Sequence, residues 1–109
     1  MAYREEVAER IRSVLERQRG VTERKMFGGI AFLHNGHMCC GVNGEDLMLR
    51  LGNEEAAKAL TEPHTRPMDF TGKPLKSMVY VNPEGYDADD DLRAWVNRAL
   101  QFAKTLPPK

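Results

Sequence analysis

Residues 26–51 read MFGGIAFLHNGHMCCGVNGEDLMLRL, and this stretch decides the fold. Asn35-Gly36 separates two short apolar runs and is typical of a two-residue type I′ hairpin turn, in which both central residues need a positive φ. Asn43-Gly44 indicates a second turn. Beyond it, the leucines at positions 47, 49 and 51 alternate with other residues, which is the period of a strand. The stretch therefore predicts a three-stranded antiparallel meander, to which residues 21–26 can add a strand.

Amphipathic helices are predicted on both sides of this meander. Over residues 4–18, apolar side chains recur at helical spacing, and Gly20 is placed to cap the end of that helix. A second, longer apolar stripe precedes Lys104. It contains Leu92, Trp95, Val96, Ala99, Leu100 and Ala103. The acidic run 87–91 comes just before this stripe, where carboxylates stabilise a helix N-terminus.

The segment between the meander and the last helix is harder to interpret. Asn53 can cap a short helix over 54–60. Residues 62–76 hold three prolines and indicate a long ordered connection, with a short strand near 68–70. A strand is predicted over 78–81, and Asn82-Pro83 ends it.

The order of these elements predicts one α+β domain over residues 1–109. We expect an antiparallel sheet of four to six strands, packed by the N- and C-terminal helices. Because the helices would form a single layer, one sheet face would remain uncovered and free for a partner or a second copy.

Composition narrows the functional classes. Sixteen basic residues balance 16 acidic ones, whereas nucleic-acid-binding modules usually carry a basic excess. No apolar run approaches the roughly 18 residues that span a bilayer, so no membrane association is expected. Cys39 and Cys40 are neighbours that would point to opposite faces of a strand, which disfavours a disulfide between them. We interpret them as reduced thiols of a cytoplasmic protein.

Three histidines and the two cysteines are the candidates for chemistry. His34, His37 and Cys39 could come together across the hairpin, and imidazole and thiolate are good zinc ligands. A structural zinc site needs four ligands, however, and a nucleophilic cysteine needs a base with an orienting acid. Neither pattern is present, so we predict no catalytic residue, no metal and no cofactor. The Gly28-Gly29 pair lacks the context of a phosphate-binding loop and indicates a backbone requirement instead.

The segment KMFGGIAF at residues 25–32, followed by Asn35-Gly36, resembles the signature of the TfoX/Sxy family N-terminal domain. Residues 47–50, residues 78–81 and the acidic entry into the last helix fit the same pattern. The resemblance implies an α+β domain linked to regulation of natural-competence genes alongside a cyclic-AMP receptor protein. Full-length regulators of this type carry a second, C-terminal domain, so we expect a stand-alone N-terminal domain here.

These observations favour a non-enzymatic regulatory or protein-interaction domain, with a protein partner or self-association. The predicted interaction surface comprises Met26, Phe27, Arg66, Lys73, Lys76 and Tyr80. One alternative is a nucleic-acid-binding module that uses Arg24, Lys25, Arg66, Lys73 and Lys76. The other is a small metal protein or enzyme built on the histidines and cysteines.

Overall fold

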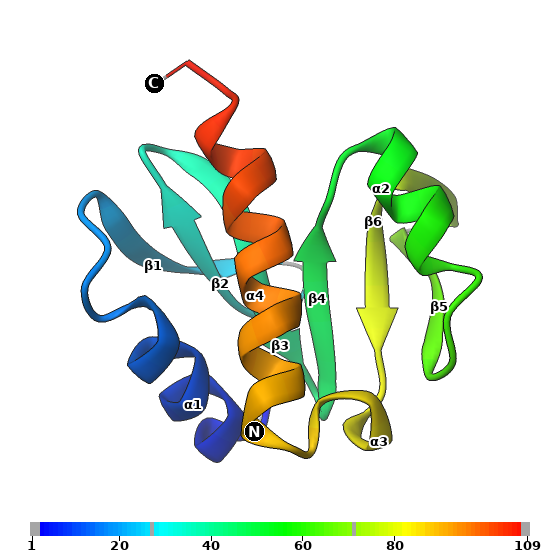
Figure 1. The fold of residues 1–109 in the computed structure, drawn as a ribbon, viewed down its shortest axis with the longest axis horizontal. Coiled ribbons are helices and arrows are strands. Elements are labelled where there is room, and N and C mark those ends of the chain that lie inside the picture. Colours follow the sequence, from blue (N-terminus) through cyan, green and yellow to red (C-terminus); the bar gives the residue numbers. More distant parts are fainter. Residues whose placement is uncertain (1–2, 27, 71, 108–109) are drawn as a thin grey trace.

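Six antiparallel strands form one sheet in the order β1-β2-β3-β4-β6-β5 (Figure 1). A computed structural model describes residues 3–26, 28–70 and 72–107 of the chain. The strands are β1 (Val21–Met26), β2 (Gly29–His34), β3 (His37–Asn43), β4 (Asp46–Arg50), β5 (Thr65–Phe70) and β6 (Lys73–Val81).

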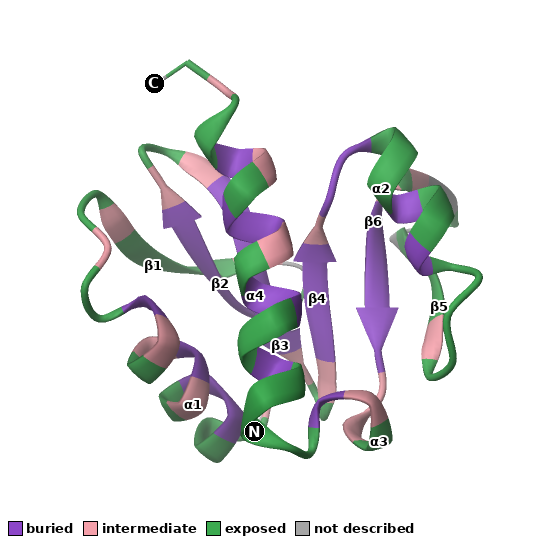
Figure 2. Cartoon of the chain, viewed as in Figure 1, coloured by how far each residue is buried: buried purple, intermediate pink, exposed green. Residues whose placement is uncertain are grey.

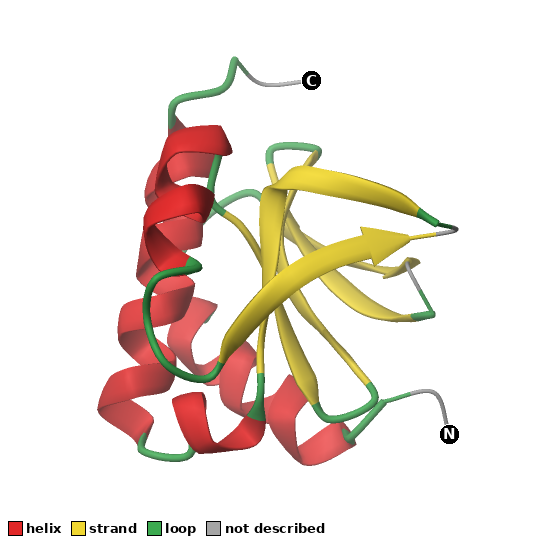
Figure 3. Ribbon diagram, turned by 90° about the vertical axis from the view of Figure 1, so that its right-hand side faces the viewer, coloured by secondary structure: helices red, strands yellow, loops and turns green. Residues whose placement is uncertain are grey.

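The helices lie on one side of the sheet, as the view in Figure 3 shows. They are α1 (Glu5–Leu15), α2 (Asn53–Ala59), α3 (Pro83–Tyr86) and α4 (Asp89–Lys104). The predicted α+β class, with N- and C-terminal helices packed on an antiparallel sheet, is confirmed. Within the described residues, no helix combines the length and the apolar character needed to cross a membrane.

The central hairpin forms as its turn residues predict. Asn35 and Gly36 have φ values of 51° and 87°, and His34 pairs with His37 on either side of them. The second turn is shifted by one residue from the prediction, because Asn43 still belongs to β3 and pairs with Asp46. Gly44 then takes the first central position with a φ of 60°, which is typical of a type II′ turn.

A helix-side core fills the space between the helices and the sheet. The predicted stripe of α4 is buried along its whole length, and α1 buries Val7, Ala8, Ile11 and Leu15. These side chains pack on strand residues such as Phe32, Leu47 and Val79. Figure 2 shows the same division, with the buried side of each long helix turned toward the strands.

The opposite sheet face is also buried, so the expectation of an uncovered face is wrong. Five strands, β2 to β6, contribute buried residues to a second cluster, the Met-rich core, and β1 packs against its margin. Its buried members are Ala31, Leu33, Met38, Met48, Met68, Met78 and Tyr80, with Met26 and Leu75 packed at its margin. Within the part of the chain that the structure describes, no helix covers this face. The sheet itself curves around it, and the β1–β2 and β5–β6 hairpins project away from the helices (Figure 3). Strongly twisted sheets can enclose side chains in this way.

The connection predicted over residues 62–76 is instead mostly a hairpin, made by β5 and a β6 that begins at Lys73. Prolines disfavour strands in a local reading of the sequence, because they cannot donate a backbone hydrogen bond. Pro67 lies on β5, the last strand of the sheet, where an edge tolerates a missing N–H. Pro74 lies in the part of β6 that extends beyond β4, because β4 pairs with β6 only from Met78 to Val81.

Two predicted helix ends also differ. α1 ends at Leu15 rather than 18, so Gly20 lies in the turn before β1 and does not cap the helix. Asn53 is the first residue of α2 and Gly52 precedes it, without a capping side-chain hydrogen bond.

Candidate interaction site

A hollow of about 340 Å³ lies between α3, α4 and the turn that joins α2 to β5. We call it the Trp95 hollow. Its walls are formed by Glu62, Pro63, His64, Glu84, Gly85, Asp91, Ala94, Trp95 and Arg98. Three segments that are far apart in the sequence therefore build one concave surface, and most of its lining side chains are polar or charged.

Backbone geometry brings the α2–β5 turn and α3 together at this place. A Cβ atom on Gly85 would lie 2.9 Å from Cβ of His64 and 2.6 Å from Cγ1 of Val81, so only glycine permits the approach. His64 itself has a φ of 68°, a left-handed conformation that is uncommon for a residue other than glycine. Its carbonyl accepts a 2.9 Å hydrogen bond from the N–H of Asn82. Such outliers persist where the surrounding structure holds them, often at binding sites.

Further hydrogen bonds hold both walls. The Thr65 hydroxyl donates to the carbonyls of Ala59 and Glu62, each at 2.9 Å. On the other side, the Tyr86 hydroxyl donates to the carbonyl of Glu45 in the β3–β4 turn, which ties α3 to the sheet. The hollow is therefore built in advance of any ligand, and a prebuilt site loses less entropy on binding.

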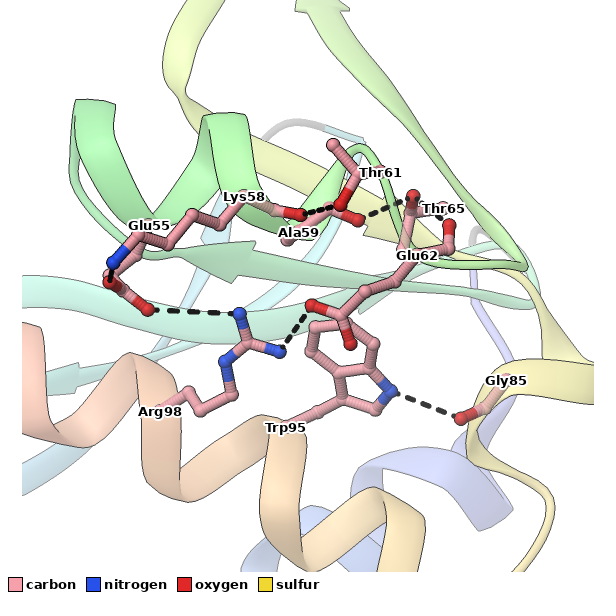
Figure 4. A network of polar contacts seen from close by, with 9 residues as sticks. All are labelled: Glu55, Lys58, Ala59, Thr61, Glu62, Thr65, Gly85, Trp95 and Arg98. Atoms are coloured by element: carbon pink, nitrogen blue, oxygen red, sulfur yellow. Dashed lines mark hydrogen bonds and ion pairs between the residues drawn. The ribbon is translucent and has the colours of Figure 1, made fainter.

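Arg98 and Trp95 form the aromatic side of the hollow (Figure 4). The Arg98 guanidinium lies 4.6 Å from the centroid of the Trp95 ring. It also pairs with Glu62 at 3.0 Å and with Glu55 of α2 at 3.8 Å. The indole N–H donates a 3.1 Å hydrogen bond to the carbonyl of Gly85. A stacked guanidinium held by two carboxylates thus bridges α4 and α2.

The charge of the hollow is negative. Glu62, Glu84 and Asp91 contribute carboxylates, and Arg98 is the arginine that lines it. Glu62 is engaged by Arg98, but among the described residues neither Glu84 nor Asp91 has an ion-pair or hydrogen-bond partner for its side chain. Two free carboxylates therefore line the same hollow as an aromatic ring that already carries one guanidinium.

Two wider hollows occur elsewhere. One, of about 550 Å³, lies where β4 meets α2, and Arg50 covers its aromatic residue Phe102 at 5.6 Å from the ring centroid. The other, of about 580 Å³, lies between α1 and α4. Arg10 in its wall is already bound to the carbonyls of Tyr86 and Asp87. The first hollow also has a wall that requires glycine, because a Cβ atom on Gly52 would lie 2.7 Å from the Phe102 ring, but no tryptophan is among the described lining residues of either hollow.

A family comparison agrees with this architecture. The model of the TfoX N-terminal domain matches residues 13–103 of the 109-residue chain, a span that includes every strand, α2, α3 and nearly all of α4. The chain belongs to the TfoX N-terminal domain family. No curated protein matches the chain.

The residues that resemble the TfoX signature have structural positions. KMFGGIAF runs from the end of β1 into β2, and residues 47–50 lie in β4. The motif around Met78 forms the part of β6 that pairs with β4. The strand motifs of the pattern therefore lie in β1, β2, β4 and β6, whereas its acidic entry into the last helix includes Asp91, which lines the Trp95 hollow.

The predicted interaction surface is partly assembled. Arg66 stacks on Tyr80, with 4.3 Å between the guanidinium carbon and the ring centroid, and Met26 lies at the margin of the same Met-rich core. Tyr80, however, is only 7% exposed. Lys76 is exposed, while Phe27 and the side chain of Lys73 lie outside the described part of the chain.

The basic residues of the nucleic-acid alternative are divided between distant strands of the sheet order. Arg24 and Lys25 lie on β1, whereas Arg66 and Lys76 lie on β5 and β6 at the other end. Arg66 is also neutralised by an ion pair with Asp46. Neutralisation of Arg66 reduces the support for a phosphate-binding track.

The histidines and thiols do not assemble into a reactive group. His37 contacts the carbonyl of Pro107, and no described hydrogen bond joins an imidazole to a carboxylate or a thiol. The described residues contain no group of three or more potential ligands that could hold a metal. Both cysteines are free and at most 1% exposed.

The two thiols lie on the same side of the sheet, which corrects the prediction of opposite faces. Phe32 pairs with Cys40 and Leu33 pairs with Met38, so Cys39 is the extra residue of a β-bulge. Both cysteines then join the helix-side core. A hydrogen bond with Cys39, together with burial, raises the pKa of the Cys40 thiol well above its usual value. A neutral, buried thiol is a poor nucleophile.

Sequence reasoning missed most of the Trp95 hollow. The sequence pattern places Trp95 in the apolar stripe of α4 and Asp91 at the N-terminus of that helix, and both positions are confirmed, but the pattern does not bring Glu84 to them. The available signal was the spacing of Trp95 and Arg98, since residues three apart share one side of a helix. Glu84 and Gly85 offered no local signal, because only tertiary packing brings α3 to this surface.

Proposed function

We propose that this chain is a non-enzymatic regulatory domain that acts by binding a protein partner through the Trp95 hollow. Membership of the TfoX N-terminal domain family supports a regulatory role, and we propose that the process regulated is the transcription of competence genes. The free thiols accord with a cytoplasmic location, which we also propose.

The observation that carries this proposal is the prebuilt hollow in which Trp95 and Arg98 are stacked next to two free carboxylates. Trp95 is only 8% exposed, because it packs in the helix-side core and beneath Arg98, so it shapes the hollow, and the exposed carboxylates of Glu84 and Asp91 are the groups open to a partner. The buried thiols and separated imidazoles provide no comparable basis for catalysis. Both faces of the sheet are buried in a core, so the sheet offers no open face to a partner. This also favours a binding site on the helix side of the domain.

The proposal can be tested by capture from host lysate, with and without nuclease. We expect the wild-type chain to retain a defined protein after nuclease treatment, and the E84K/D91K variant to lose most of it. The matched control is D87K/D90K, which reverses two exposed carboxylates in the same stretch of chain that do not line the hollow. Equal losses in both variants would contradict the assignment of the site.

A third variant, R24E/K25E, distinguishes nucleic-acid binding from protein binding. Retained material that disappears with nuclease, or that only R24E/K25E fails to capture, would show that nucleic acid is the partner. Light scattering on the purified wild-type chain reports self-association. A dimer that E84K/D91K disrupts and D87K/D90K preserves would identify a second copy as the protein partner.

A further inference from the structure

The Trp95 hollow already holds one guanidinium group, that of Arg98. Arg98 presents a guanidinium that stacks on the Trp95 ring and pairs with carboxylates on both sides. The guanidinium is planar, suits bidentate carboxylate contacts and stacks on aromatic rings better than an ammonium does. The surroundings of Arg98 therefore show which chemical group the walls of the hollow accommodate.

Room and charge remain for a second group of the same kind. The hollow retains about 340 Å³ with Arg98 in place. Glu84 approaches from α3 and Asp91 from the first turn of α4, and neither is paired among the described residues. A positively charged side chain that entered here would meet two carboxylates that have no counter-charge among the described residues.

We propose that the Trp95 hollow binds an arginine side chain from a basic segment of the partner protein, with its guanidinium between Glu84 and Asp91. This inference rests on the proposed function and names the chemistry of the partner. The incoming arginine would share the negative field of Glu62 with Arg98, so the two guanidinium groups compete. Arg98 then limits the affinity of the hollow by competition, in addition to bridging α4 and α2.

The test uses short glycine–serine peptides that carry two arginines, two lysines or two citrullines. Citrulline keeps the shape of arginine and removes its charge. Trp95 is the single tryptophan of the chain, so its fluorescence reports on the hollow directly. We expect saturable, salt-sensitive fluorescence changes with the arginine peptide, weaker changes with the lysine peptide and none with the citrulline peptide.

Substitutions then assign the response to named side chains. E84Q and D91N should each weaken arginine-peptide binding by up to about fivefold, as expected for loss of one exposed ion pair. The matched control D87N/D90N should leave it unchanged. R98Q should tighten binding by about twofold or more, because the competing guanidinium is removed. A purely structural role for Arg98 would predict the opposite sign, and circular dichroism confirms that each variant is folded.

Equal binding of the arginine and citrulline peptides would overturn the inference, as would equal effects of E84Q/D91N and D87N/D90N. Either result would leave the proposed function intact if lysate capture still depends on the hollow. Loss of capture altogether, with normal binding of the arginine peptide, would instead refute the proposed function alone. The two failures are therefore distinguishable.

Discussion

Single residues with no side chain determine how closely the strands approach at the family signature. Gly28 has a φ of 76°, which suits glycine at the β1–β2 turn. At Gly29 the constraint is space, since a Cβ atom there would lie 2.0 Å from the carbonyl oxygen of Val42. The Gly28-Gly29 pair thus has a structural explanation, as its lack of phosphate-loop context predicted.

Replacing Gly29 with alanine should lower the free energy of unfolding by about 3 kcal/mol, because the obstructing atoms are backbone and a packed core resists added volume. The control is G44A. Gly44 has nothing within 4 Å of its ideal Cβ position but a φ of 60°. G44A should therefore lower the free energy of unfolding by about 1 kcal/mol, the penalty for an alanine in the left-handed backbone conformation. Urea unfolding followed by Trp95 fluorescence measures both, and equal costs would refute the role of space at Gly29.

At the level of elements, one arginine joins α1 to β1. Arg12 makes a two-pronged ion pair with Glu23 of β1, with both distances at 2.8 Å, and also binds Glu5 at 2.8 Å. Its guanidinium lies 5.9 Å from the centroid of the Phe32 ring. The hydrogen bond from Arg12 lowers the pKa of Glu23, and the same carboxylates raise the pKa of Arg12.

This arrangement predicts an acid-dependent loss of stability. The pKa of Glu23 in the folded chain lies below its usual value of 4.5, so its contribution is present above pH 4.5 and is lost as pH falls through the folded pKa. R12M should lower the free energy of unfolding by about 1 kcal/mol at pH 7. Below pH 4.5, the free energy of unfolding of R12M should fall less steeply than that of the wild type. Arg24, an exposed residue of the same hairpin, gives the control R24M, which should follow the wild type. Urea midpoints between pH 3 and pH 7 measure the difference; parallel curves for R12M and the wild type would contradict it.

Across the whole molecule, one curved sheet supports a core on each face. The helix-side core is covered by helices, whereas the Met-rich core is enclosed by the strands alone. Methionine suits such an enclosure, because its flexible thioether side chain fills irregular space. Met48 lies on the central strand β4 and is 0% exposed.

Truncation of Met48 distinguishes an enclosed core from an open surface. M48A should lower the free energy of unfolding by about 3 kcal/mol, as expected for a buried methionine, and M48L by less than about 1.5 kcal/mol. Met26, half-buried at the margin of the same core, provides the comparison M26A, which should cost clearly less than M48A. Urea denaturation supplies the values. If M48A changed the free energy of unfolding by no more than about 0.5 kcal/mol, as is typical of a surface position, the result would contradict an enclosed core and support an open sheet face.

Much of the fold was predictable because its signals are local. A turn that needs two positive φ values indicates Asn35-Gly36, and alternation or helical spacing of apolar residues indicates the meander and α4. Each depends on residues within one or two turns of each other. The hairpin of β5 and β6 escaped prediction because tolerance of its prolines depends on which strand lies at the edge, and sheet order is a long-range property.

The sequence by itself determined the α+β class, the central meander and the helix that carries Trp95, since backbone preferences and hydrophobic periodicity act over a few residues. Only the tertiary structure decided that the sheet closes over its second face, that a bulge turns Cys39 and Cys40 to the same side, and that Glu84, Asp91 and Arg98 meet around Trp95. Those outcomes depend on strand register, sheet curvature and contacts between segments distant in the chain, which no local pattern encodes.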